Sequence, residues 1–283
     1  IAGQTNSCLS CLSDVYLIKT DSIGDTLWTK SYGGSNTDKA QAIEQTDDGG
    51  YIIAGTTVLS GNSEMYLIKT NNIGDTLWTK AFGVTMYNEA YSVQQTVDGG
   101  YIVVGYSDSL GTGNRDFYLL KTDTNGNLLW SKLFGGTGDD MAWCLRQTMD
   151  GGFIITGQTN SFGAGNYDVY LIKTDSIGNL LWSKTFGGLY TEYSYSVQQA
   201  NDGGYIIAGM NLFAGNSNIY LIKTDGNGNS DCYESIPSTI ASTPITLVLS
   251  TITIISFPIT TVTDPPTTIG GGAIENSLCT LVG

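Results

Sequence analysis

The chain has 283 residues, of which 41% are apolar and 13% are charged, so it can bury a large core and is not disordered by composition. Its formal charge is −14, and its few basic residues are spread along the chain, which argues against nucleic acid as a partner. The chain has no histidine, which excludes catalysis and metal ligation by imidazole. Its longest apolar-looking stretch, 245–259, is interrupted by Ser and Thr and is too short to span a membrane.

One phrase, Asp-Gly-Gly followed by an aromatic residue and Ile, recurs along the chain. Its copies start at Asp48, Asp98, Asp150 and Asp202. The residues Ile1-Ala2-Gly3 match the end of the same phrase, so part of a fifth unit is visible. A fixed period near 50 residues indicates an architecture built from repeated supersecondary units.

Within one unit the sequence predicts four strands and no helix. Asp48-Gly49-Gly50 is typical of a hairpin turn, and residues 71–74 form a second tight turn. The runs between the turns are rich in β-branched and aromatic residues. In chain order the predicted strands are 42–46, 51–56, 66–70 and 75–80.

The second and third strands of each unit are apolar on both faces, so both faces of each sheet must be covered. Face-to-face stacking in a ring satisfies this, and the sequence therefore predicts an all-β fold, a β-propeller of four-stranded antiparallel blades. Five units are visible, of which the first and the last are incomplete. We expect one tryptophan per unit to be largely buried between blades. These residues are Trp28, Trp78, Trp130 and Trp182.

The composition changes after the last unit, which divides the chain into a repeat region, 1–231, and a tail, 232–283. The tail is rich in Ser, Thr and Ile and holds all five prolines. The prolines argue against central strands but allow edge or wrapping strands, and segments 245–249 and 251–255 are the candidates. They could complete the chain's own ring, be donated to a neighbouring copy, or leave the tail loosely attached.

The repeat resembles a family of β-propeller repeats found in secreted and surface proteins of Bacteroidota. The matching segments are Asp168–Asn179, Trp182–Gly188 and Gln199–Gly209. The resemblance implies an extracellular or outer-surface location and cargo of the type IX secretion system, although no sorting domain is present in this sequence. It also implies O-glycans where Asp-Ser precedes an apolar residue. The candidates are Ser22, Ser109 and Ser176.

The cysteines have two interpretations. Cys8 and Cys11 are spaced as in a redox motif or half a zinc site, but a local disulfide in an oxidising compartment is favoured because nothing completes a zinc site. Cys232 and Cys279 bracket the tail and are candidates for a second disulfide. Cys144 is interpreted as a small buried residue.

Two acidic features suggest a metal or a catalytic role. The turns 123–127 and 225–231 resemble the start of a calcium loop, although a hairpin explains them equally well. The loop between the second and third strands varies in length among the units, and we expect function on the rim of the fold where these loops lie. Carboxylates on this variable rim could support glycosidase chemistry. These carboxylates, which recur at equivalent places in several units, are Asp38, Glu89, Asp139, Asp140 and Glu192. Because a catalytic pair should break the repeat, an enzyme is the less favoured interpretation, and no residue is assigned as catalytic.

Three residues break the repeat within one unit, namely Arg115, Trp143 and Arg146. Aromatic faces and guanidinium groups suit a carbohydrate or peptide ligand, and packing particular to that unit is the alternative. The sequence therefore predicts a secreted or surface β-propeller that acts as a binding or structural module, with surface glycans, other proteins or itself as partners. The rivals are a subunit of an extracellular filament and a carbohydrate-active enzyme.

Overall fold

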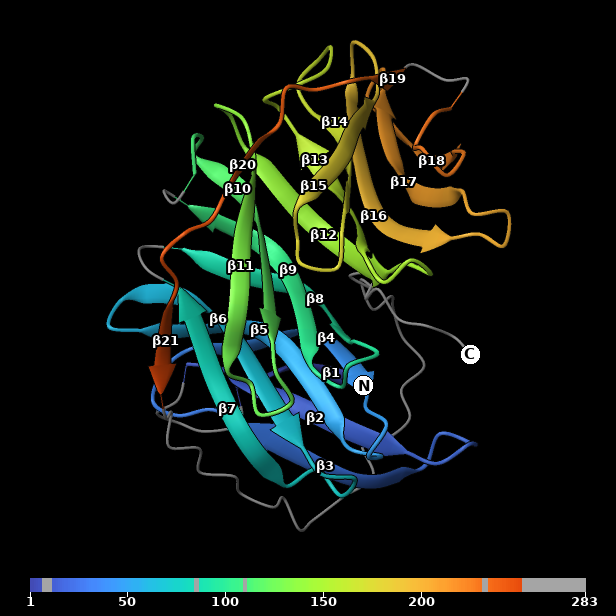
Figure 1. Ribbon diagram of the computed structural model, residues 1–283. Coiled ribbons are helices and arrows are strands. Elements are labelled where there is room, and N and C mark those ends of the chain that lie inside the picture. The colour runs from blue at the N-terminus through green and yellow to red at the C-terminus, as the bar shows by residue number, and fades with distance from the viewer. Residues whose placement is uncertain (7–11, 84–86, 109–110, 231–233, 251–283) are drawn as a thin grey trace.

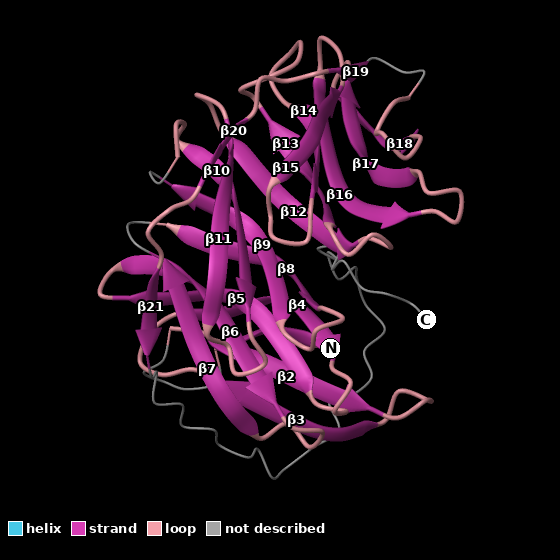
Figure 2. Cartoon of the chain, viewed as in Figure 1, coloured by secondary structure: helices cyan, strands magenta, loops and turns pink. Residues whose placement is uncertain are grey.

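The computed structural model describes residues 1–6, 12–83, 87–108, 111–230 and 234–250. Over these residues the chain consists of strands and loops (Figure 2), arranged in five antiparallel sheets of three to five strands. The prediction of an all-β fold made of repeated antiparallel sheets is confirmed. No helix in the described part of the chain is long and apolar enough to cross a membrane.

The sheets follow the repeat units in chain order (Figure 1). The first sheet contains β1 (Ala2–Thr5), β2 (Asp14–Thr20) and β3 (Thr26–Tyr32). The second contains the meander β4 (Asp38–Gln45), β5 (Tyr51–Leu59), β6 (Asn62–Thr70) and β7 (Thr76–Gly83). The third contains β8 (Asn88–Gln95), β9 (Tyr101–Asp108), β10 (Arg115–Thr122) and β11 (Leu128–Gly135).

The last two sheets complete the series. The fourth contains β12 (Asp140–Gln147), β13 (Phe153–Thr159), β14 (Asp168–Thr174) and β15 (Leu180–Phe186). The fifth contains β16 (Thr191–Gln199), β17 (Tyr205–Phe213) and β18 (Asn216–Lys223). Four apolar clusters fill the spaces between consecutive sheets, which explains why the middle strands are apolar on both faces.

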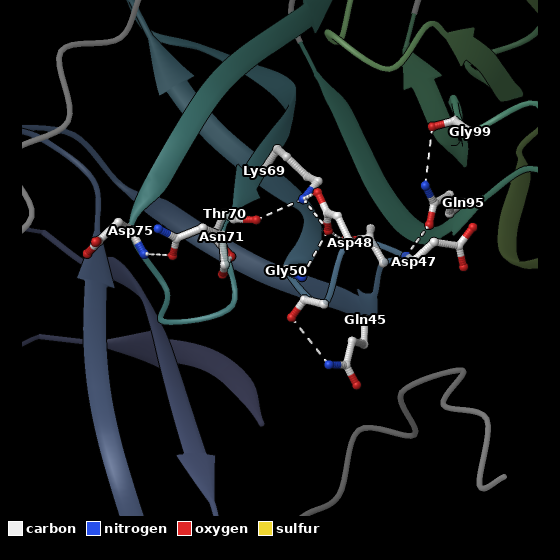
Figure 3. A network of polar contacts seen from close by, with 12 residues as sticks. Gln45, Asp47, Asp48, Gly50, Lys69, Thr70, Asn71, Asp75, Gln95 and Gly99 are labelled. Carbon is white, nitrogen blue, oxygen red and sulfur yellow. Dashed lines mark hydrogen bonds and ion pairs between the residues drawn. The ribbon is translucent and has the colours of Figure 1, made fainter.

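An ion pair closes the hairpin turn of the repeated phrase. In the second sheet Lys69 Nζ lies 2.8 Å from Asp48 Oδ2, while Asp48 Oδ1 accepts hydrogen bonds from Thr46 and from the amide of Gly50 (Figure 3). Burial opposes ionisation, but these hydrogen bonds outweigh it and lower the pKa of Asp48 to about 2. Equivalent pairs form in the next three units, which explains why Asp and Lys recur at fixed positions.

A glutamine side chain joins each sheet to the one before it. Gln95 Oε1 accepts a hydrogen bond of 2.8 Å from the amide of Asp47 in the preceding sheet, and Gln95 Nε2 donates to Gly99 O within its own turn (Figure 3). Gln147 and Gln199 repeat the contact with the sheets before them. The spacing between neighbouring sheets is therefore held by polar contacts as well as by apolar packing.

The repeated tryptophans are half-buried, not largely buried as predicted. Each lies on an outer strand and contacts the aromatic residue that begins the second strand of the next unit, as Trp130 does with Phe153 at 6.1 Å between ring centroids. The ring also lies over the glycine of the following turn, Gly178 in this case. One face of the indole therefore packs against the next sheet while the other stays accessible.

The tail runs along the outer edges of three sheets. Its strands β19 (Glu234–Ser235), β20 (Ile240–Ser242) and β21 (Leu247–Ser250) pair with β15, β11 and β7 respectively. In the described part of the tail, these strands add a fifth strand to three complete meanders and do not supply the strand missing from the first or last unit. The exposed outer edges of complete sheets provide the pairing sites, and the prolines of the tail allow strands at such edges. The candidate strand 251–255 lies outside the described residues.

Candidate functional site: a central cleft

A cleft of about 730 Å³ lies where the inner strands of all five sheets approach one another. The side chains that line it are mainly aromatic rings and carboxamides. They include Tyr91, Trp143, Tyr193 and Tyr195, together with Gln4, Gln41 and Gln158. No described residue of the loops of variable length, where the sequence predicts function, lines this cleft.

Four equivalent β-bulges aim side chains into the cleft. In each complete inner strand the pairing register shifts at one residue, and these residues are Gln41, Tyr91, Trp143 and Tyr195. A bulge inserts one residue opposite the partner strand and redirects its side chain. All four bulge residues line the cleft.

A glycine in the neighbouring strand makes each bulge possible. In the fourth sheet a Cβ on Gly157 would lie 2.0 Å from the carbonyl oxygen of Met141, which is far closer than atoms can approach. A Cβ added to Gly55, Gly105 or Gly209 would clash in the same way with a carbonyl oxygen of the neighbouring strand. The glycine in the repeated phrase is therefore required by the close approach of the bulged strand.

Trp143 and Arg115, two of the predicted ligand-binding residues, belong to one aromatic network beside the cleft. The Trp143 ring meets Tyr91 edge-on at 4.5 Å, and Tyr91 stacks on Tyr106 at 5.9 Å. The Arg115 guanidinium lies 5.0 Å from the Tyr106 ring centroid and pairs with Asp108 at 3.1 Å. Arg115 therefore supports the aromatic network but does not line the cleft. The prediction that Arg115 shares one unit with Trp143 and Arg146 is wrong, because Arg115 lies on β10 of the third sheet and the other two lie on β12 of the fourth.

Polar contacts fix the orientation of the rings at the cleft. Trp143 Nε1 donates a 3.2 Å hydrogen bond to Gln158 Oε1, and Tyr91 Oη donates to Glu89 Oε2 at 2.5 Å. Burial, followed by the charge of Glu89, raises the pKa of Tyr91 above its usual range. Both rings are thus neutral hydrogen-bonded groups held in place before any ligand binds.

Arg146, the third predicted residue, lies elsewhere. It is buried on β12, donates to its neighbour Leu145 O at 2.8 Å, and faces the carboxylate of Glu44. Burial lowers the pKa of Arg146 and the charge of Glu44 opposes this. The structure does not bring Arg146 together with Trp143 and Arg115 at one site.

Three of the carboxylates expected on the accessible rim are instead buried between sheets. Asp38, Asp140 and Glu192 each face an acidic residue of the preceding sheet, namely Asp14, Asp116 and Asp168. Burial, reinforced by the facing charge, raises the pKa of Asp116 and of Asp168 to about 6. Asp139 and Glu89 accept hydrogen bonds from tyrosines, Tyr167 and Tyr91.

The candidate calcium turns are closed by their own amides. Asp123 Oδ1 accepts hydrogen bonds from the backbone of Asn125 and Asn127, and Asp123 Oδ2 accepts from the Asn127 side chain. Asp225 repeats this arrangement with Asn227 and Asn229. Among the described residues no group of three or more acidic or cysteine side chains is placed to hold a metal ion.

Only some of the predicted disulfide and glycosylation sites lie among the described residues. Cys144 is buried, as the sequence predicts, and it is disulfide-bonded. The chain's other cysteines, Cys8, Cys11, Cys232 and Cys279, lie outside the described residues, and so do the two disulfides predicted for them. The predicted glycosylation sites Ser22 and Ser176 are exposed in tight turns, while Ser109 lies outside the described residues.

Of the residues that line the cleft, the sequence predicted only Trp143 as ligand-binding, because the others follow the repeat and do not break it. The residues Gln41, Tyr91, Trp143 and Tyr195 occupy one repeat position, and that position carries a large side chain in all four units that contain it. The signal that could have revealed these residues is the glycine that recurs in the next strand of each unit, since glycine inside a strand often marks a bulge. The chain matches no protein-family model and no curated protein.

Proposed function

We propose that this protein is a carbohydrate-binding β-propeller module of the cell exterior, with the central cleft as its binding site. The single observation that carries the proposal is the set of four bulges that direct Gln41, Tyr91, Trp143 and Tyr195 into one cleft. A repeated device that costs ladder hydrogen bonds in every complete inner strand indicates a site rather than a packing accident.

The chemistry of the cleft suits sugars. The apolar face of a pyranose packs on aromatic rings, and its hydroxyl groups exchange hydrogen bonds with carboxamides, which both donate and accept. Gln4, Gln41 and Gln158 supply those amides beside Tyr91 and Trp143. A largely pre-formed cleft of about 730 Å³ is within the range that holds a small ligand.

Two further observations support the proposed fold and location. Consecutive sheets pack face to face, and residues from all five line one central cleft, as the blades of a propeller would. The disulfide at Cys144 favours an oxidising compartment, in keeping with a secreted or surface protein.

An array of plant, algal and bacterial oligosaccharides, probed with the full chain, tests the proposal. We expect binding to a subset of glycans that share a backbone, and we expect soluble glycan to compete for it. Binding to no glycan, or to arrayed peptides alone, would refute the carbohydrate assignment.

One exposed surface favours a second role in assembly. In the fifth sheet Ile206, Ile219 and Leu221 are 40%, 91% and 66% exposed. In the fourth sheet the next sheet covers their equivalents, which are Ile154, Val169 and Leu171. We propose that this face packs against the first sheet of a second copy, which would build a head-to-tail assembly.

Sedimentation measures this second role directly. We expect the sedimentation coefficient of the full chain to rise with protein concentration, and Leu221→Glu to abolish the rise. Leu129→Glu, at a residue of β11 that is also exposed, is the matched control and should change nothing. A concentration-independent monomer would refute the assembly.

A further inference from the structure

The tail sequence has a period of its own. Threonine recurs every seven residues, at Thr239, Thr246, Thr253, Thr260 and Thr267. Four of these threonines have a proline two residues before them, at Pro237, Pro244, Pro258 and Pro265. The described part of the tail forms strands, so this period does not reflect a helix.

One seven-residue step moves the tail from one sheet to the next. The residues at one position of the period pair with equivalent phenylalanines of the outer strands β15, β11 and β7. The pairs are Glu234 with Phe186, Ala241 with Phe134 and Val248 with Phe82. The pairing register is therefore the same on three consecutive sheets.

The periodic threonine occupies an equivalent place on each sheet. Thr246 Oγ1 lies 2.5 Å from the hydroxyl of Tyr118 and 2.7 Å from Ser131 Oγ, in the third sheet. On the fourth sheet Thr239 contacts the equivalent hydroxyls of Tyr170 and Ser183. Each threonine thus provides a hydrogen-bond partner for a tyrosine hydroxyl near the outer edge of the sheet.

The second sheet offers an equivalent position for a threonine of the tail. Tyr66 is the equivalent tyrosine, it is 1% exposed, and Thr79 lies beside its hydroxyl as Ser131 lies beside that of Tyr118. The Tyr66 hydroxyl makes no hydrogen bond of ordinary geometry among the described residues. One sheet further on, the outer edge of β3 has no partner strand in the described part of the chain.

We propose that residues 253–256 of this chain dock on these two sites. Thr253 Oγ1 bonds the Tyr66 hydroxyl, and Ile254–Ser256 pair with β3 so that Ile255 faces Tyr32 and Ser256 faces Ser31. This is the register of the three described tail strands, moved by one period. The docked segment extends the pairing of the tail to the outer edges of four neighbouring sheets. It also covers an open edge that would otherwise invite pairing with another chain.

Disulfide trapping in the full chain tests the proposed register. We expect the double variant Ser31→Cys, Ser256→Cys to cross-link under mild oxidation, with peptide mapping by mass spectrometry to identify the linked cysteines. Thr185→Cys, Ser235→Cys is the positive control, because these paired hydroxyls lie 2.5 Å apart at the equivalent positions. Ser31→Cys, Thr263→Cys places the second cysteine one period later and should not cross-link.

The proposal is overturned if residues 31 and 256 do not cross-link while the positive control does, or if 31 and 263 cross-link instead. Amide exchange of the unsubstituted full chain gives an independent readout. Outer-edge amides of β3 should exchange as slowly as those of β7, which pairs with β21, and more slowly than those of β18, whose outer edge is unpaired in the described residues. Exchange of β3 as fast as that of β18 would also overturn the proposal.

Discussion

At the scale of single residues, buried carboxylates make the stability of the protein depend on pH. Between the second and third sheets Asn88 Nδ2 donates a 3.0 Å hydrogen bond to Glu64 Oε2. At the equivalent place between the third and fourth sheets two carboxyl groups face each other, Asp116 and Asp140. A carboxylate pair can form such a bond only when one partner is protonated. This pairing could not be predicted from the sequence, because partners two strands apart along the chain meet only when the sheets stack.

The raised pKa values predict that the protein is more stable in mild acid than at neutral pH. Unfolded aspartate titrates near ~4, whereas Asp116 and Asp168 titrate at about 6 in the folded state. Their stabilisation is fully present below ~4 and is lost as the pH rises through about 6. Asp48 and Asp150, with pKa values of about 2, lose their contribution as the pH falls below ~4. Calorimetric melting temperatures should therefore be highest near pH ~4–5, and a melting temperature that rises steadily from pH 5 to 7.5 would contradict this.

Exchanging amide and carboxylate at these junctions should shift stability in opposite directions. Asp116→Asn reproduces the neutral partner found at Asn88, so we expect it to stabilise the protein at pH 7.5 by on the order of 1–3 kcal/mol and to have little effect at pH 4.5. Asn88→Asp creates a second carboxylate beside Glu64 and should destabilise at pH 7.5. Urea unfolding at both pH values measures the changes, and equal effects of Asp116→Asn at the two pH values would show that the pair carries no charge penalty.

At the scale of elements, the strand and turn pattern followed from the sequence while the bulges did not. Hairpins at Asp48-Gly49-Gly50 and its copies were predictable from local turn chemistry, and Gly49 has the positive φ of 78° that such a turn requires. A bulge depends on the register between two strands, which local sequence does not determine. For the same reason the sequence indicates Trp143 but not its neighbours Tyr91 and Tyr195.

The glycine opposite a bulge provides a direct test of the bulge geometry. Gly157→Ala places a Cβ 2.0 Å from Met141 O, so we expect a loss of more than about 2 kcal/mol in the free energy of unfolding and a displaced Trp143. Gly3 is the equivalent residue of the first sheet, where no atom lies within 4 Å of the added Cβ. Gly3→Ala should change the free energy by less than about 0.5 kcal/mol. Chemical denaturation of both variants distinguishes the bulge from a general effect of alanine in a strand, and equal losses would refute the role of the bulge.

At the scale of the whole molecule, the sequence predicted repeated antiparallel sheets and a separate tail but not how the tail is used. The repeat is visible because every unit solves the same packing problem with the same residues. The tail instead pairs with the outer edges of sheets that already have four strands. Its own strands β19, β20 and β21 are only two to four residues long. Such short strands carry little local signal and are specified by the edges they meet. The cleft likewise exists only when inner strands from all five sheets come together.

Calorimetric titration with the oligosaccharide that the full chain binds best on the array tests most directly the claim that the bulge residues form a sugar-binding cleft. Trp143→Ala should weaken binding at least tenfold, about 1.4 kcal/mol, because it removes one of the aromatic rings that line the cleft. Trp130→Phe, on outer strand β11 and away from the cleft, is the matched control and should bind as the unsubstituted protein does. Unchanged affinity of Trp143→Ala, with a melting temperature equal to that of the parent, would contradict the account.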